Sequence, residues 1–190
     1  MVQGLIAGGP RALLKAVEGA EDSREGGRAD ILGHGACSLL GGPVEARDVV
    51  IGIAASGRTP YVWGVIAEAK RAGATTGLLC FNPNVLEALA LPDTPEGCAP
   101  DHVLAIDAGA KQSFVTLVRR KCSRRHFFRF EHVMNLAHSS GPELLTGSTR
   151  LKAGTATKLV LNVLTTLGLG VGMGKVASNL MIGALEASRS

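Results

Sequence analysis

The sequence lacks closely spaced cysteines, a long uninterrupted hydrophobic run and a secretory leader pattern. The four cysteines, at positions 37, 80, 98 and 122, have no CxxC spacing, so we expect free thiols in a reducing compartment. Residues 159–173 are apolar but interrupted, and they are shorter than the about 20 residues that cross a bilayer. No basic segment precedes an apolar core near Met1. We therefore expect a soluble, cytoplasmic protein without a metal site.

The basic charge of the chain is local. The net charge is +4, and residues 111–130 contain seven Lys and Arg side chains and no acidic one. The other 13 basic residues are outnumbered by 16 acidic residues. The charge is therefore poor evidence for a nucleic-acid-binding protein, and we expect neither a nucleic-acid nor a membrane partner.

Residues 108–140 differ in composition from the rest of the chain. They hold four of the five phenylalanines and three of the five histidines, together with the seven basic residues. A basic, aromatic patch for nucleic acid or membrane is one interpretation. The other, which we adopt, is an inserted and poorly ordered segment outside the core, within one domain that spans residues 1–190.

The chain is organised around a strand, a loop and a helix. Val49 to Ala55 form an apolar, β-branched run that predicts a strand buried on both faces. The loop contains Ser56, Gly57 and Arg58, and Thr59 can cap a helix that begins at Pro60 and continues to about residue 72. A loop at this position presents backbone N–H groups and a positive helix dipole, which favours binding of an anion such as phosphate.

Further strands and helices alternate along the chain, as in an α/β protein with a parallel sheet and helices on both faces. The spacing predicts strands at 2–7, 75–81 and 102–107, and helices from Pro10, at about 23–31, at 85–91, through 158–164 and at 175–187.

Three further patterns have alternative interpretations. Residues 52–59 nearly fit the nucleotide-binding loop G-x-x-x-x-G-K-[ST], but Arg58 replaces the lysine, and no GxGxxG dinucleotide pattern is present. The carboxylates of residues 18–25 either form a solvated helix start or supply a general base. Residues 146–150 either cap a helix or bind a second anion.

Four longer motifs, taken in order, resemble the N-acetylmuramic acid 6-phosphate etherase family. This family belongs to the sugar-isomerase (SIS) domain superfamily, which also includes the glucokinase regulatory protein. The resemblance covers nearly all of the chain except residues 108–140, and a fifth match extends it near the C-terminus. The matching segments are residues 5–9, 18–27, 52–61, 145–156 and 174–181.

The resemblance implies a three-layer α/β/α sandwich with a parallel sheet that forms a homodimer. It also implies removal of D-lactate from the sugar phosphate, a step of amino sugar metabolism, to leave N-acetylglucosamine 6-phosphate. A carboxylate takes the C2 proton of the ring-opened sugar, a carboxylic acid protonates the departing ether oxygen, and water then adds. No metal or organic cofactor takes part.

By matching motifs, the resemblance assigns the base to Glu21. It places Ser56, Gly57, Arg58 and Thr59 in a sugar-phosphate loop. It also places a second group of residues at the pocket, namely Ser148, Thr149, Arg150 and Lys152.

Two departures from the family pattern bear on activity. The family's first strand, its following loop and the helix with the catalytic acid match nothing in this sequence. Residues 108–140 also interrupt a junction that is short in the family. We therefore expect a partial SIS domain that binds a sugar phosphate and releases D-lactate only if the acid is supplied. The alternative is a non-catalytic, phosphosugar-sensing regulator of a sugar kinase.

Overall fold

The computed structural model describes residues 2–37, 42–81, 99–106, 115–119, 145, 149–172, 176–177 and 180–181. The chain has two compact units, whose main segments are Gln3–Ser148 and Thr149–Ser190. Among the described residues, no helix is both long and apolar enough to cross a membrane. The predicted helix at 85–91 and most of the segment 108–140 lie outside these residues.

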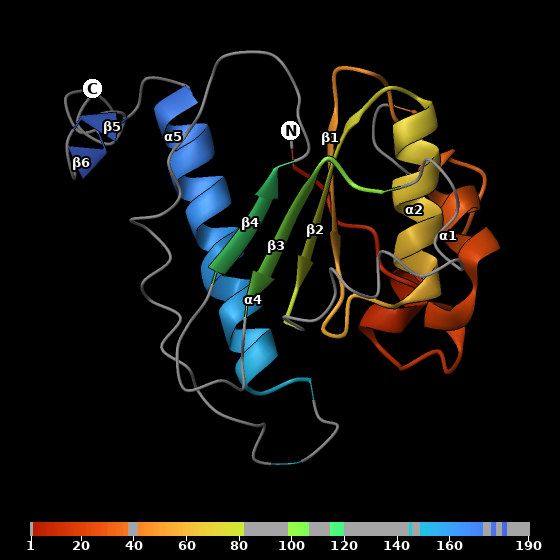
Figure 1. Cartoon of the computed structure of the whole chain (residues 1–190). Helices are drawn as coiled ribbons and strands as arrows, with labels where there is room; N and C mark the ends of the chain where they lie inside the picture. The colour runs from red at the N-terminus through yellow and green to blue at the C-terminus, as the bar shows by residue number, and fades with distance from the viewer. Residues whose placement is uncertain are drawn as a thin grey trace, which may run out of the picture. The chain divides into compact units, whose positions relative to one another are not determined.

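The first unit is built on a four-stranded sheet (Figure 1). Strand β1 (Val49–Ile53) pairs parallel with β2 (Thr75–Cys80), with Val49 opposite Thr75. Strand β2 in turn pairs parallel with β3 (His102–Ile106), with Gly77 opposite His102. Strand β4 (Val115–Arg119) comes from the segment 108–140 and pairs antiparallel with β3. The predicted α/β class with parallel strands is therefore confirmed, and one antiparallel strand is added to the sheet.

Helix α2 (Pro60–Arg71) covers one face of this sheet, and helix α1 (Arg24–Ile31) packs against α2 (Figure 1). Helix α1 begins at Ser23, whose side chain accepts a hydrogen bond from the backbone N–H of Gly26 at 3.0 Å. Helix α2 begins at the predicted proline. The core between α2 and the sheet contains Trp63, Ile66, Leu78, Cys80 and Val103.

The opposite face of β1 is exposed, so the prediction of a strand buried on both faces is wrong for this strand. Val49, Ile51 and Ile53 are 67%, 41% and 37% exposed. Gly52 points toward α2, since a Cβ there would meet Val62 at 2.5 Å. Among the described residues β1 pairs with β2 alone, which leaves its other edge and its second face without a neighbour.

Helices α1 and α2 cross in backbone contact. A Cβ on Gly27 would lie 2.1 Å from the carbonyl oxygen of Tyr61, and one on Gly64 would lie 2.1 Å from that of Arg24. Glu68, which is 7% exposed, accepts hydrogen bonds from Arg28 and Arg71 and so adds an ionic link between the helices. Glycine at both crossing positions and this buried carboxylate fix the relative position of α1 and α2.

The predicted strand at residues 2–7 is not formed. The segment instead packs Leu5 and Ala7 against the cluster of Ile31, Tyr61 and Val65, and none of the described strands pairs with its backbone. The helix predicted from Pro10 is a short 3-10 helix, η1 (Gly9–Leu13). The apolar side chains that we expected on its buried side are exposed instead. The exposed fractions are 73% for Leu13, 94% for Leu14 and 41% for Val17.

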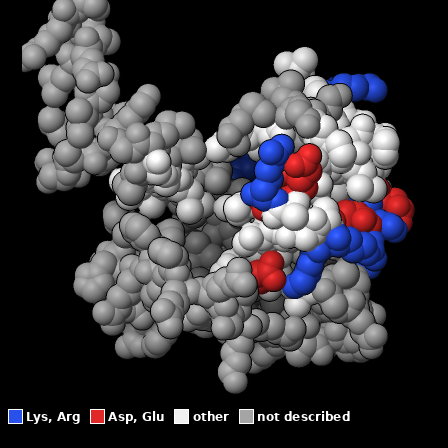
Figure 2. All heavy atoms as spheres, turned by 90° about the horizontal axis from the view of Figure 1, so that it is seen from above, with Lys and Arg blue, Asp and Glu red and all other residues white. Residues whose placement is uncertain are grey.

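Ion pairs lie at the amino-terminal end of the strands. Asp101 accepts hydrogen bonds from the backbone N–H and the hydroxyl of Thr76, at 2.9 and 2.8 Å, and from Lys70 at 3.2 Å. Arg47 pairs with Glu45 at 3.0 Å. Figure 2, which views this end, shows basic and acidic side chains interspersed. The described residues therefore form no continuous patch of one charge on this face.

The second unit contains helix α4 (Lys152–Val163), a π-helical turn η5 (Leu164–Gly168) and helix α5 (Leu169–Gly172). The prediction of a helix over 175–187 is wrong where it can be compared. Two short strands, β5 (Val176–Ala177) and β6 (Leu180–Met181), pair antiparallel instead. The intervening sequence, Ser-Asn, is typical of a turn.

Candidate functional site

The loop of residues 54–59 connects the carboxyl end of β1 to the start of α2. The backbone N–H of Ala54 donates to Leu79 at 3.0 Å, which continues the pairing with β2 past the end of β1. Gly57 then turns the chain with φ +73°, and its N–H donates to the carbonyl of Ala54 at 3.1 Å. The N–H of Arg58 donates to the hydroxyl of Ser56 at 3.2 Å.

The polar side chains of this loop are at least partly exposed. Ser56 and Arg58 are exposed, Thr59 is half-buried, and Gly57 is buried. Thr59 is the residue that caps α2, as predicted, but its hydroxyl makes no capping hydrogen bond. Pro60 has no N–H, and the Trp63 N–H donates to the carbonyl of Thr59 at 3.2 Å. The first-turn N–H groups of a helix have no partner within the helix, so those of Tyr61 and Val62 are the donors that this turn offers to an anion.

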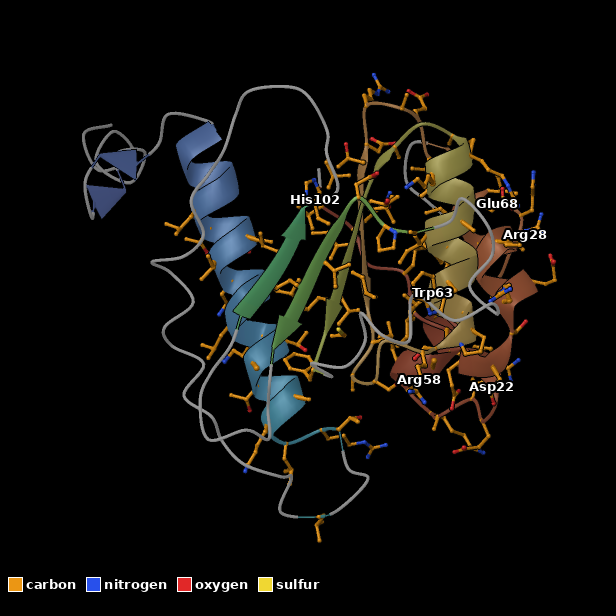
Figure 3. The ribbon with its side chains drawn as sticks, in the orientation of Figure 1. Asp22, Arg28, Arg58, Trp63, Glu68 and His102 are labelled. Carbon is orange, nitrogen blue, oxygen red and sulfur yellow. The ribbon has the colours of Figure 1, made fainter. Side chains whose placement is uncertain are left out.

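The acidic segment lies beside the same end of α2. Glu21 and Asp22 belong to the 3-10 helix η2 (Ala20–Asp22), which packs against α2, and both side chains are exposed. Figure 3 places Asp22 and Arg58 at the same end of α2, whereas His102 lies at the far end of the sheet. The fold of the first unit therefore brings the segment of Glu21 and the predicted phosphate loop to one end of one helix.

The second predicted group of site residues belongs to the other unit. Thr149 and Arg150 precede α4, and Lys152 is its first residue. Leu151 is the capping residue of α4, without a side-chain capping hydrogen bond, so neither Thr149 nor Arg150 is the predicted cap. Ser148 lies outside the described residues. The proximity of this group to the loop at 56–59 stays a prediction.

The described residues of the predicted site carry hydroxyl, guanidinium and carboxylate side chains. No group of three or more His, Cys, Asp or Glu side chains that could hold a metal ion occurs within the described ranges. A carboxylate near a bound phosphate can reach other atoms of the same small ligand as a general base. The roles predicted for Glu21, Ser56, Gly57, Arg58 and Thr59 remain predictions.

Sequence reasoning missed three buried hydrogen bonds, made by two groups of residues close to the site. The indole N–H of Trp63 donates to the carbonyl of Gly57 at 3.0 Å. Asp30, which is 2% exposed, accepts hydrogen bonds from the Tyr61 hydroxyl at 2.6 Å and from the N–H of Cys37 at 2.9 Å. The only signal in the sequence was that the single Trp and the single Tyr both lie in the first turn and a half of α2.

These contacts also shift two pKa values. Burial, with the neighbouring Asp30 carboxylate, raises the pKa of the Tyr61 hydroxyl above its ordinary value. Burial is also the main reason why the pKa of the Cys37 thiol is raised. Both groups are therefore uncharged at neutral pH, and Cys37 donates to the carbonyl of Ile6 at 3.4 Å as a thiol.

Comparison with known proteins gives consistent results. A family model described as the glucokinase regulatory protein N-terminal SIS domain matches residues 1–70. The chain is 42% identical over 182 residues to an N-acetylmuramic acid 6-phosphate etherase of Aliivibrio salmonicida. It is 41% identical to N-acetylmuramic acid 6-phosphate etherase 2 of Enterococcus faecalis and 41% identical to an etherase of Salmonella schwarzengrund. These matches cover 96% of the chain but only 44% or 45% of each relative.

Proposed function

Because the chain belongs to the N-acetylmuramic acid 6-phosphate etherase family, we propose that it binds the phosphate of an amino-sugar phosphate at the loop of residues 56–59. One observation carries this proposal. The turn at Gly57 leads directly into the start of α2, an arrangement that favours anions in general, and the helix η2 with Glu21 packs against the same helix.

In this proposal the phosphate accepts hydrogen bonds from the N–H groups at the start of α2 and from the hydroxyls of Ser56 and Thr59. Arg58 supplies a positive charge, which is weakened by solvent because the side chain is exposed. For Thr149, Arg150 and Lys152, with Ser148, we keep the assignment that the resemblance implies, as residues that bind the substrate. The ligand is an N-acetylmuramic acid 6-phosphate or a related hexose phosphate.

Glu21 is proposed to act as the general base. The C2–H bond of the ring-opened sugar is acidified by the adjacent aldehyde, so its electron pair moves into the conjugated system while the proton moves to the Glu21 carboxylate. Loss of D-lactate also needs an acid that protonates the ether oxygen. The resemblance supplies only the base, so we propose sugar-phosphate binding and C2 deprotonation for this chain rather than complete turnover.

Exchange of the C2 proton tests this function without a leaving group. In heavy water, N-acetylglucosamine 6-phosphate is expected to exchange its C2 proton for deuterium in the presence of the chain, as measured by proton NMR. Glu21→Gln is expected to slow the exchange about 10²–10⁴-fold, the usual contribution of a general base. Glu18→Gln, two residues before the start of η2, is the matched control. Exchange that survives Glu21→Gln would contradict the assignment.

A non-catalytic regulator is the second candidate. The match of residues 1–70 to the glucokinase regulatory protein domain favours it. The regulator is expected to lower the rate of a sugar kinase from the same source, and a hexose phosphate is expected to change that inhibition. A kinase rate that is unchanged by the chain at any sugar phosphate concentration would contradict this candidate.

A further inference from the structure

Trp63 touches the predicted phosphate loop through one polar atom. Its indole N–H donates to the carbonyl of Gly57 at 3.0 Å, and the side chain is only 8% exposed. In Figure 3 it lies on α2, beyond Arg58 toward the middle of the helix. The rest of the ring packs in the core with Ile66, Leu78 and others, so its position is fixed by the sheet.

The hydrogen bond completes the restraint of the loop. The N–H of Gly57 is held by Ala54, and the N–H of Arg58 is held by the Ser56 hydroxyl. The Trp63 contact holds the carbonyl of Gly57, on the other side of the same residue. With φ +73°, Gly57 has a conformation that would otherwise exchange with several others, because glycine is the least restricted residue.

We infer that Trp63 is a positioning residue that sets the affinity of the loop for the phosphate group of a sugar phosphate. It does so through the Gly57 carbonyl and does not touch the ligand. This inference rests on the proposed function. A loop already held in its binding shape loses less conformational entropy when the anion binds, so the preorganised form binds more tightly.

The chain contains a single tryptophan, which permits a selective test. Biosynthetic replacement of tryptophan by benzothienylalanine changes only Trp63 and keeps the size and shape of the ring. Sulfur replaces the N–H, so the donor alone is lost and the Gly57 carbonyl remains unpaired. The substituted chain is expected to bind N-acetylglucosamine 6-phosphate about tenfold more weakly by titration calorimetry, a change that corresponds to about 1.4 kcal/mol. Trp63→Phe is a second variant, with the same expectation.

Tyr61→Phe is the matched control. It removes a buried hydrogen bond from the same helix, to Asp30 instead of the loop. Loss of a contact that is only structural lowers the unfolding midpoint and leaves the affinity for N-acetylglucosamine 6-phosphate unchanged. We expect this behaviour of Tyr61→Phe. Trp63 fluorescence of the unsubstituted chain is also expected to change on addition of N-acetylglucosamine 6-phosphate and to stay constant with N-acetylglucosamine.

The possible results distinguish a failure of the role of Trp63 from a failure of the proposed sugar-phosphate binding. If the unsubstituted chain binds the phosphorylated sugar and the benzothienylalanine chain binds it equally well, the role of Trp63 is refuted and the proposed function stands. If the unsubstituted chain binds no phosphorylated sugar in calorimetry, the proposed function fails, and the inference fails with it. Weaker binding by both Trp63 variants, with Tyr61→Phe unchanged, supports the inference.

Discussion

Asp101 is the residue whose charge most clearly contributes to stability. Burial tends to raise the pKa of its carboxyl, but hydrogen bonds from Thr76 and Lys70 outweigh burial and hold the pKa below the ordinary value of 3.8. A carboxylate with a lowered pKa stabilises the fold at pH values above its unfolded pKa. That contribution is lost as the pH falls through the folded pKa.

Asp101→Asn is therefore expected to reduce the free energy of unfolding at pH 7 and to have a smaller effect near pH 3. The size of the effect at pH 7 is limited because the side chain is partly exposed. Urea unfolding followed by circular dichroism at the two pH values measures the difference. Asp48→Asn, at an exposed turn where Asp48 accepts from the Glu45 N–H, is the control. An equal loss for Asp101→Asn at both pH values would contradict the role of its charge.

Also at the residue scale, the sequence predicted where the loop lies but did not predict the buried hydrogen bonds around it. The composition of residues 56–60 predicted a tight loop and a helix start, because these depend on local backbone preferences. The hydrogen bonds of Trp63 and Tyr61 depend on which distant groups the fold brings together, and no local preference encodes them. Thr59 shows the same limit, since its type predicted a capping hydrogen bond that the structure does not form.

At the scale of elements, the crossing of α1 and α2 depends on two glycines. Gly64→Ala would place a Cβ 2.1 Å from the backbone oxygen of Arg24, so the helices must separate. We expect a loss of at least about 2 kcal/mol in the free energy of unfolding, in the range of other overpacking substitutions. Because η2 packs against α2, affinity for a sugar phosphate is expected to fall as well.

Gly4→Ala provides the control for that substitution, because a Cβ there meets nothing within 4 Å. Chemical denaturation in urea measures both variants. If Gly64→Ala is as stable as Gly4→Ala, the backbone contact does not limit the approach of the helices.

The predicted helices and strands are confirmed where a local sequence pattern also has a packing or pairing partner in the fold. The helix at about 23–31 and the strands at 75–81 and 102–107 were located within a residue or two. Residues 2–7 have a strand-like composition, but a strand also needs a neighbour for its backbone, and the segment packs through side chains instead. The prediction for β1 was wrong in a similar way. Its apolar residues predicted burial on both faces, but a sequence pattern does not show whether any element covers the second face.

At the scale of the whole molecule, the chain spans less than half the length of the curated relatives it matches. If Glu21 acts without the second carboxylic acid, release of D-lactate from N-acetylmuramic acid 6-phosphate is expected to be at least about 10²-fold slower than with a complete catalytic pair. A coupled D-lactate dehydrogenase assay measures it, with an intact curated relative as reference. Release at the rate of that relative would show that another group supplies the acid.

The central claim is that the loop after β1 recognises the phosphate of a sugar phosphate. Titration calorimetry of the purified chain with N-acetylglucosamine 6-phosphate and with N-acetylglucosamine tests it most directly. The account predicts saturable binding of the phosphorylated sugar and no measurable heat of binding with the other. Equal binding of the two sugars, or binding of neither, would contradict it.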